Sequence, residues 1–148
     1  PSDEGFETDV HGDHKLGDWS FRNLIVTEEP GGGLRLVPDP NAPQRPFLTV
    51  NPLDLTLPVT VRIQGEARPA ADLELSWRTQ GSGAKFTRDP EAKLTLGPDG
   101  ETSVLRIGGT EKIIHLRISL PAKRSEPIDI ESLVLRDATG KRVVLSQH

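Results

Sequence analysis

Apolar and polar residues alternate with a period of two along three segments of this chain. The segments 59–64, 73–78 and 114–120 each place apolar residues at every second position, with Thr, Arg, Gln, Glu, Ser or His between them. This period is typical of a β-strand that buries one face and exposes the other. No segment sustains the 3.6-residue apolar repeat of a helix. The pattern therefore predicts a protein built from strands.

Ten short strands are predicted, each bounded by turn-forming residues such as Gly-Gly-Gly, Pro-Asp-Pro-Asn, Gly-Pro-Asp-Gly and Asp-Ala-Thr-Gly. Many short strands with frequent turns are typical of an all-β, two-sheet antiparallel β-sandwich. The predicted strands cover residues 19–27, 33–38, 46–50, 58–65, 72–79, 92–97, 101–107, 112–120, 127–136 and 141–146.

The strand at 127–136 contains a change of parity. Its apolar positions move from 128 and 130 to 133 and 135, which predicts a β-bulge near Glu131-Ser132. By the same alternation, Trp77, Trp19 and Phe21 are predicted to lie in the core.

The domain organisation follows from length and local composition. Residues 1–18 are polar, acidic and spaced by glycine, and are predicted to form an N-terminal arm. Residues 19–148 are predicted to form one β-sandwich domain, since 148 residues suit a single domain with a substantial core. The chain has no Met and begins with Pro1, so we expect a processed product or, in preference, a fragment of a larger protein.

Composition excludes several classes of function. The net charge of −4 and the mixture of acidic and basic residues argue against a nucleic-acid partner, which would require a basic stripe. The chain has no Cys, so it has no disulfide, thiol nucleophile or thiolate metal ligand. No apolar run is long enough to span a membrane, and the first residues do not look like a signal peptide.

The order of the strand motifs resembles a known family. Trp19 leads the first strand, Gly-Gly-Gly-Leu-Arg-Leu-Val-Pro and Pro-Val-Thr-Val-Arg-Ile follow, and the chain continues through Trp77, residues 114–120 and residues 128–135. This order resembles the jelly-roll, galactose-binding-like domain at one end of secreted bacterial sulfatases and glycoside hydrolases. The resemblance implies a non-catalytic accessory module with an extracytoplasmic location. It also implies that the partner is a glycan or the parent catalytic domain.

Catalytic signatures are missing from the sequence. A sulfatase needs a Cys or Ser in a Pro-x-Arg context, and neither is present. There is no Gly-x-Ser-x-Gly nucleophile elbow, and no pair of carboxylates stands out as a glycosidase pair. We therefore expect a protein that is not an enzyme.

Two metal sites are considered. The resemblance implies a structural calcium ion that joins the first and last strands through Glu7, in Gly5-Phe6-Glu7, and Glu131. Glu131 stands where the family has Asp, and two ordinary surface carboxylates explain the same residues equally well. His11 and His14, with three nearby Asp residues, also have ligand chemistry, although a solvated acidic arm is the simpler interpretation.

Polar positions of the strands supply the candidate binding site. If their strands are neighbours, Arg62, Arg78, His115 and Arg117 converge with Gln64, Glu74 and Asp129 on one sheet face. Guanidinium groups there would bind sulfate or carboxylate oxygens. Both Trp residues are assigned to the core, so Phe86, beside Lys85, is the candidate aromatic platform. An anionic glycan is therefore favoured over a neutral one.

Alternatives to glycan binding stay open at this point. The same charged residues would form cross-strand ion pairs on a solvated face. The domain would then be a structural interaction domain that packs against a catalytic domain and has no ligand. A third alternative is an independent protein of the bacterial envelope. A glycan binder should show convergent Arg or aromatic side chains, whereas an interaction domain should expose an apolar patch.

Overall fold

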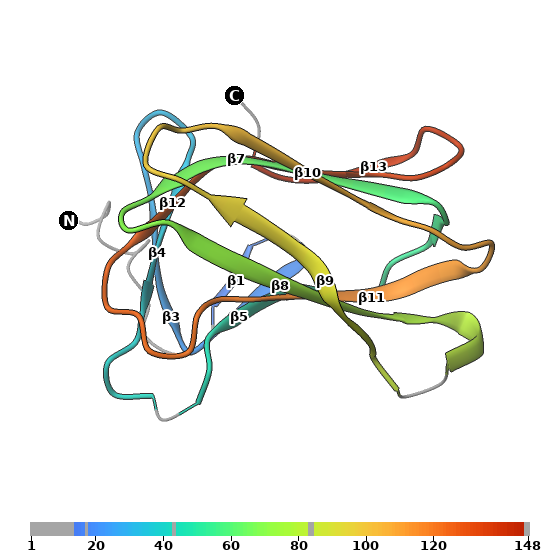
Figure 1. Ribbon diagram of the computed structural model, residues 1–148, viewed down its shortest axis with the longest axis horizontal. Helices are drawn as coiled ribbons and strands as arrows, with labels where there is room; N and C mark the ends of the chain where they lie inside the picture. Colours follow the sequence, from blue (N-terminus) through green and yellow to red (C-terminus); the bar gives the residue numbers. More distant parts are fainter. Residues whose placement is uncertain (1–13, 17, 43, 83–84, 147–148) are drawn as a thin grey trace.

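The computed structural model describes residues 14–16, 18–42, 44–82 and 85–146, which form a sandwich of two antiparallel sheets (Figure 1). The first, here called the β11 sheet, has the order β1-β2-β5-β11-β8-β9, with β6 paired to β11. The second, the β7 sheet, has the order β10-β7-β12-β4-β3, with β13 paired to β12. This architecture confirms the predicted two-sheet fold.

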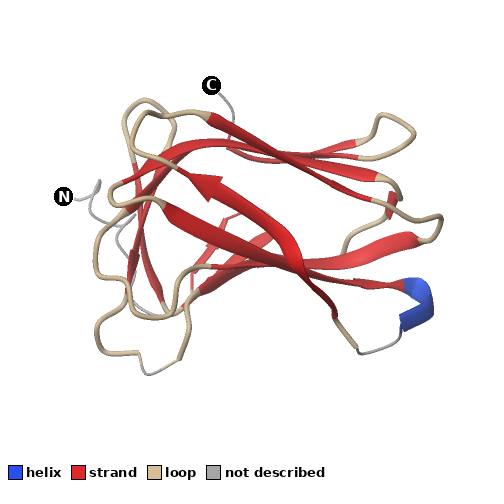
Figure 2. Cartoon of the chain, viewed as in Figure 1, coloured by secondary structure: helices blue, strands red, loops and turns tan. Residues whose placement is uncertain are grey.

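Strands make up nearly all the regular structure, as Figure 2 shows, and one short 3₁₀ turn, η2 (Gln80–Ser82), precedes β9. None of the described segments forms a helix long and apolar enough to cross a membrane. The strands are β1 (His14–Leu16), β2 (Trp19–Arg22), β3 (Leu24–Glu28), β4 (Leu34–Pro38), β5 (Phe47–Val50), β6 (Leu55–Thr56), β7 (Val59–Ala67), β8 (Ala71–Thr79), β9 (Thr87–Leu96), β10 (Thr102–Ile107), β11 (Lys112–Ser119), β12 (Ile128–Arg136) and β13 (Arg142–Ser146).

The observed strands differ from the predicted ones in four places. The predicted strand 19–27 is divided at Asn23, whose φ of 60° turns the chain from the β11 sheet into the β7 sheet. Asn tolerates this left-handed conformation better than most residues. β9 begins at Thr87 rather than at residue 92, and β1 and β6 were not predicted. β1 lies within the predicted arm, of which residues 1–13 are outside the described residues.

The core consists of the inward positions of both sheets. Leu and Ile predominate, and Trp19 and Phe21 are buried as predicted, with exposed fractions of 2% and 0%. Trp77, also predicted to be in the core, is only partly buried and packs against the buried core residues. Facing sheets that interdigitate their side chains in this way remove apolar area from water, which stabilises the sandwich.

β12 contains the predicted bulge. Its register with β7 shifts between Ile130 and Ser132, which confirms the parity change read from the sequence. Beside the bulge, the two backbones approach so closely at Gly65 that an added Cβ would lie 2.2 Å from the carbonyl oxygen of Asp129. A residue without a side chain is therefore needed at this position of β7.

Asp137, in the turn from β12 to β13, is the one buried charged residue among those described. Its carboxylate accepts hydrogen bonds from the backbone N–H groups of Thr56, Thr139 and Lys141, each at 2.9 Å. These donors, the Thr56 N–H above all, lower the pKa of Asp137 to about 2. The carboxylate therefore ties the β12–β13 turn of one sheet to β6 of the other.

Candidate functional site

A cluster of polar and aromatic side chains lies on the outer face of the β11 sheet. His115 and Arg117 flank the buried Leu116 in β11, so the pleat directs both polar side chains away from the core. The register places Arg117 between Thr49 of β5 and Ser76 of β8. Side chains from three adjacent strands therefore meet on this face.

Arg117 is stacked between two phenylalanine rings. Its guanidinium carbon lies 4.3 Å from the ring centre of Phe47 and 4.7 Å from that of Phe86. The guanidinium carbon of Arg78 lies 5.7 Å from the Phe86 ring centre. A cation at this range is attracted by the negative face of the ring. The rings thus hold two guanidinium groups on the face of the sheet.

His115 has hydrogen-bond partners that define its tautomer. The Thr49 hydroxyl donates its single hydrogen to the Leu116 carbonyl at 2.8 Å, so it can only accept from His115 Nε2, which lies 2.6 Å away. The Nε2 atom therefore carries the proton. Nδ1 then accepts from Nε and Nη2 of Arg78, at 3.4 and 3.3 Å.

The surroundings of His115 favour its neutral form. Its pKa is lowered by burial first, and then by the positive charges of Arg78 and Arg117. The Phe86 ring meets the imidazole edge to face, with 4.9 Å between ring centres and 64° between planes. His115 is therefore neutral at pH 7, beside the positively charged Arg78 and Arg117.

A groove of about 650 Å³ continues from this cluster across the sheet face. Arg45 lines the groove, and its Nε donates to the Leu120 carbonyl at 2.6 Å while its Nη1 pairs with Glu74 at 3.0 Å. The groove thus combines hydroxyl, carboxylate and guanidinium groups around the stacked arginine. Its lining residues are Arg45, Phe47, Glu74, Leu75, Ser76, Asp89, Arg117 and Ser119.

The structure brings together four of the five residues that the sequence proposed for ligand binding, namely Arg78, Phe86, His115 and Arg117. It does not bring Arg62 to them. Arg62 belongs to β7, in the other sheet, so the expectation that it shares their face is wrong. Gln64 and Asp129 lie in the β7 sheet as well, because alternation specifies a face of a strand but does not specify the sheet that the strand joins.

Sequence reasoning missed two residues of the cluster, Phe47 and Thr49. Both alternate in β5 with the buried Leu48 and Val50, so a parity argument applied to residues 47–50 would have placed them on the outside. Arg45, just before this strand, was missed as well, and no local pattern distinguishes it.

The metal predictions are not tested by the structure. Glu7, His11 and the nearby Asp9 and Asp13 lie outside the described residues. Glu131 is exposed beside the bulge of β12. Within the described ranges, no group of three His, Cys, Asp or Glu side chains is arranged to hold a metal ion. The described residues therefore supply one carboxylate of the expected calcium pair.

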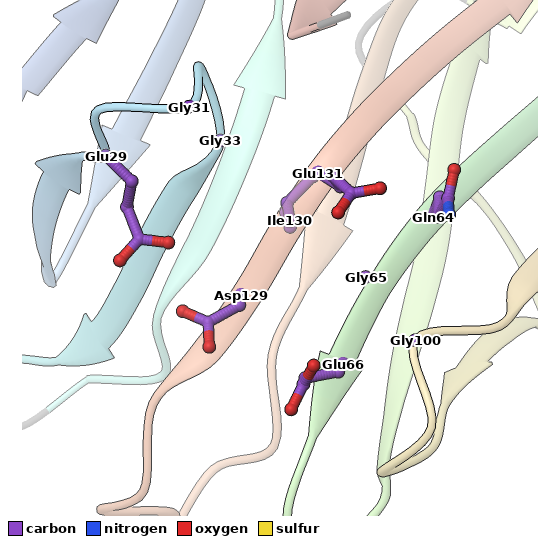
Figure 3. A pocket seen from close by; sticks show the side chains of 10 residues that line it. All are labelled: Glu29, Gly31, Gly33, Gln64, Gly65, Glu66, Gly100, Asp129, Ile130 and Glu131. Carbon is purple, nitrogen blue, oxygen red and sulfur yellow. The ribbon is translucent and has the colours of Figure 1, made fainter. Parts of the chain in front are cut away.

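A second hollow, of about 620 Å³, lies on the outer face of the β7 sheet (Figure 3). Four carboxylates line it, from Glu29, Glu66, Asp129 and Glu131. Arg35 binds Asp129 through two hydrogen bonds of 2.8 and 3.1 Å and lies 3.8 Å from Glu29. This hollow is acidic and is on the opposite side of the sandwich from the Arg117 cluster.

Comparisons with known proteins give a likeness of fold. No protein-family model matches this chain, and no curated protein sequence matches it. Solved structures do match. CsCBM6-3 from Clostridium stercorarium, solved in complex with cellobiose, is 14% identical, with a TM-score of 0.54 over 86% of this chain and 95% of that chain.

Two further structures show the same likeness. One is described as carbohydrate binding module family29, with 9% identity and a TM-score of 0.55 over 95% of this chain and 87% of that chain. The other is an exo-beta-agarase, with 9% identity and a TM-score of 0.60 over 87% of this chain. This domain covers 25% of the agarase chain. The fold is therefore the jelly-roll sandwich that carbohydrate-binding modules also have, whereas these matches do not address the predicted link to sulfatases.

Proposed function

We propose that this domain is a non-catalytic carbohydrate-binding module that holds an anionic glycan on the outer face of the β11 sheet. The observation that carries the proposal is the stacking of the Arg117 guanidinium between Phe47 and Phe86, with Arg78 on the same ring. The likeness of fold to carbohydrate-binding modules supports the carbohydrate-binding part of this proposal, and the preference for an anionic ligand rests on the arginine cluster alone.

The stacking favours an anionic ligand for a physical reason. A neutral sugar is usually held by a free aromatic face, against which the apolar side of the pyranose packs. Here Arg117 lies over both Phe47 and Phe86, which leaves less ring surface for a sugar. A guanidinium is a planar group that carries its N–H donors along its edges. Such a planar fork matches the oxygens of sulfate or carboxylate.

The groove offers binding groups rather than a catalytic pair. Of its two carboxylates, Glu74 is engaged by Arg45 at 3.0 Å. The hydroxyls of Ser76 and Ser119 can bond sugar hydroxyl groups beside the arginine. The groove therefore suits recognition of a polar, charged polymer at an open surface.

The wider context belongs to the proposal as well. We infer an accessory role in a secreted, extracytoplasmic sulfatase or glycoside hydrolase, with the parent catalytic domain as the second partner. The agarase likeness supports a modular context, because this fold occupies 25% of that longer chain.

A glycan array at low and high salt tests the proposal. We expect binding to sulfated or uronate-containing glycans that fades as salt rises, because charges on an open sheet are screened. Loss of both guanidinium groups in Arg78→Ala/Arg117→Ala should weaken binding by about tenfold or more, since hydrogen bonds to charged groups are the stronger kind. Arg68→Ala/Lys123→Ala removes the same charge away from the cluster and should bind like the wild type.

The opposite pattern would contradict the proposal. Suppose that the domain binds a neutral glycan, that the affinity does not change with salt concentration, and that Arg78→Ala/Arg117→Ala binds as tightly as the wild type. This result would exclude both the proposed site and the proposed ligand class. No binding to any glycan would favour the alternative of a structural interaction domain.

A further inference from the structure

Four arginines lie together on the outer face of the β7 sheet, on the side of the sandwich opposite the Arg117 cluster (Figure 1). They come from four consecutive strands, in the order β10, β7, β12 and β13. All four are exposed, and each has a neighbour in its strand that is buried or packs against the core. The group, here called the β7-face arginines, consists of Arg62, Arg106, Arg136 and Arg142.

Strand register places three of these arginines in one line across the sheet. Arg106 of β10 and Arg136 of β12 both stand opposite Thr60 of β7, one on either side of it. Arg136 also stands opposite Arg142 of β13. Neighbouring strands are about 4.8 Å apart, so the line extends over about 14 Å from β10 to β13. Arg62 is two residues from Thr60 in β7 and adds a fourth guanidinium beside the line.

The β7-face arginines have no side-chain partner among the described residues. In that part of the chain, the ion pairs involve other cations, namely Arg35, Arg45, Arg68, Lys93, Lys112 and Lys141. Like charges directly opposite each other in a sheet are destabilising. Arg136 and Arg142 are such a pair. An anion bound between them would therefore relieve a repulsion that exists in the free domain.

We propose that the β7-face arginines form a second binding site, which takes an anionic polysaccharide that carries sulfate or uronate groups. A guanidinium presents a planar fork of N–H donors that matches the oxygens of sulfate or carboxylate. Several such forks in line suit a polymer that repeats its negative charge. The choice of a glycan among polyanions rests on the proposed function, whereas the site itself uses no residue of the β11 sheet.

The dimensions of the site favour a narrow, linear ligand over a protein. A line of about 14 Å, with Arg62 about 7 Å to one side, outlines roughly 100 Å² of sheet. A stable protein–protein interface covers about 800 Å² on each partner. The partner of the β7-face arginines is therefore better explained by a single polymer strand than by a folded protein.

The apolar side chains beside the arginines are too small to favour a lipid surface. Val104, Val134 and Val144 stand in the same line across the sheet as Arg62. Segments that lie in a membrane interface insert larger side chains, such as Trp, Phe or Leu. The three valines instead provide a low surface between the guanidinium groups, and a sugar ring can lie against it.

The acidic hollow on the same face determines the direction of the bound polymer. Along β7 the outward positions pass from Arg62 to Glu66, so a polymer parallel to the strands would meet carboxylates. Glu66 is about 13 Å from Arg62, which exceeds the screening length of about 8 Å at physiological salt. Its charge is also offset by Arg68, at 3.6 Å. The polymer should therefore cross the strands, along the line from Arg106 to Arg142.

This second site should bind more weakly than the Arg117 cluster. Among the described residues, the recorded ring contacts of arginines involve Arg78 and Arg117, so no aromatic ring holds the β7-face arginines in place. Their side chains must lose conformational freedom when the ligand binds. The weak binding that remains in Arg78→Ala/Arg117→Ala is then binding at this site. If the proposed function holds as well, one domain can hold two polymer strands, one on each face.

Methyl NMR of the intact chain tests this site separately from the first one, in the Arg78→Ala/Arg117→Ala background. The probes are a heparin-derived hexasaccharide, which carries sulfate, and hexagalacturonate, which carries carboxylate alone. With at least one probe, we expect the methyl signals of Val104, Val134 and Val144 to shift at low salt and to return at high salt. The signals of the buried valines should keep their positions, which shows that the fold is intact.

Isothermal titration calorimetry with the same probe identifies the residues. Adding Arg62→Ala/Arg136→Ala to this background should weaken binding by about tenfold or more, because hydrogen bonds to charged groups are the stronger kind. The control Arg68→Ala/Lys123→Ala removes the same charge elsewhere and should leave the affinity unchanged.

Three results would overturn the proposal. The first is a titration in which neither probe shifts the three outward valine signals. The second is an affinity that Arg62→Ala/Arg136→Ala does not change. The third is equally tight binding of polyglutamate, or of vesicles that contain phosphatidylglycerol, since the site would then not be specific for a glycan. Failure of the proposed function looks different, because Arg78→Ala/Arg117→Ala would then bind the hexasaccharide as tightly as the wild type.

Discussion

At the scale of single residues, His115 shows how neighbours select one protonation state. Thr49 needs a donor at its hydroxyl oxygen and Arg78 needs an acceptor, and only the neutral imidazole with its proton on Nε2 supplies both. A second proton on Nδ1 would break the contact with Arg78 and add a third positive charge beside Arg117. The lowered pKa of His115 therefore has burial and these two cations as its causes.

The lowered pKa predicts a loss of stability in mild acid. In the unfolded chain His115 titrates near its ordinary value of about 6.5, and in the folded protein it titrates lower. Between these two values the unfolded state binds more protons, so the free energy of unfolding falls as the pH falls. Thermal melts of wild type and His115→Gln between pH 7 and pH 5 should show a smaller decrease for the variant. Parallel pH profiles would contradict the assignment.

At the scale of elements, β7 and β12 form the central pair of their sheet, and their close approach depends on one glycine. The shift of register at the bulge brings the Asp129 carbonyl to within 2.2 Å of a Cβ built on Gly65. Backbone cannot yield as a flexible side chain can, so any larger residue must push the strands apart.

Gly65→Ala should therefore destabilise the domain by about 1–3 kcal/mol, the usual range for overpacking in a closely packed region. The matched control is Gly97→Ala, since a Cβ added at Gly97 meets nothing within 4 Å. Equilibrium urea unfolding of both variants measures the difference. If the two variants unfold at the same urea concentration, the strands can move apart at Gly65 without a loss in the free energy of unfolding.

At the scale of the whole molecule, the calcium ion that would join the first and last strands through Glu7 and Glu131 stays a prediction. A ligand that binds only the native state stabilises it, so a chelator should lower the melting temperature of the wild type. The decrease should largely vanish in Glu131→Ala and persist in the control Glu126→Ala. If the chelator does not change the melting temperature of the wild type, Glu131 is an ordinary surface carboxylate and not a calcium ligand.

Local sequence determined the strands and much of the core. Alternation with a period of two predicted the strands around residues 59–64, 73–78 and 114–120, and the parity change predicted the bulge of β12. These features follow from the pleat of a single strand and from the burial of one of its faces. Consecutive residues are therefore enough to predict them. The same logic identified Trp19 and Phe21 as buried.

Pairing between distant strands decided what alternation left open. Arg62 and Arg78 look alike in the sequence, yet β7 and β8 belong to different sheets and their arginines lie on opposite sides of the sandwich. Phe47 and Phe86 meet at Arg117 only because β5 pairs with β11 and the segment before β9 folds over the same face. Strand order depends on the packing of the whole core, and no local period encodes it. The sequence by itself therefore determined that the chain forms a sandwich of alternating strands, and only the tertiary structure decided which side chains share each of its two faces.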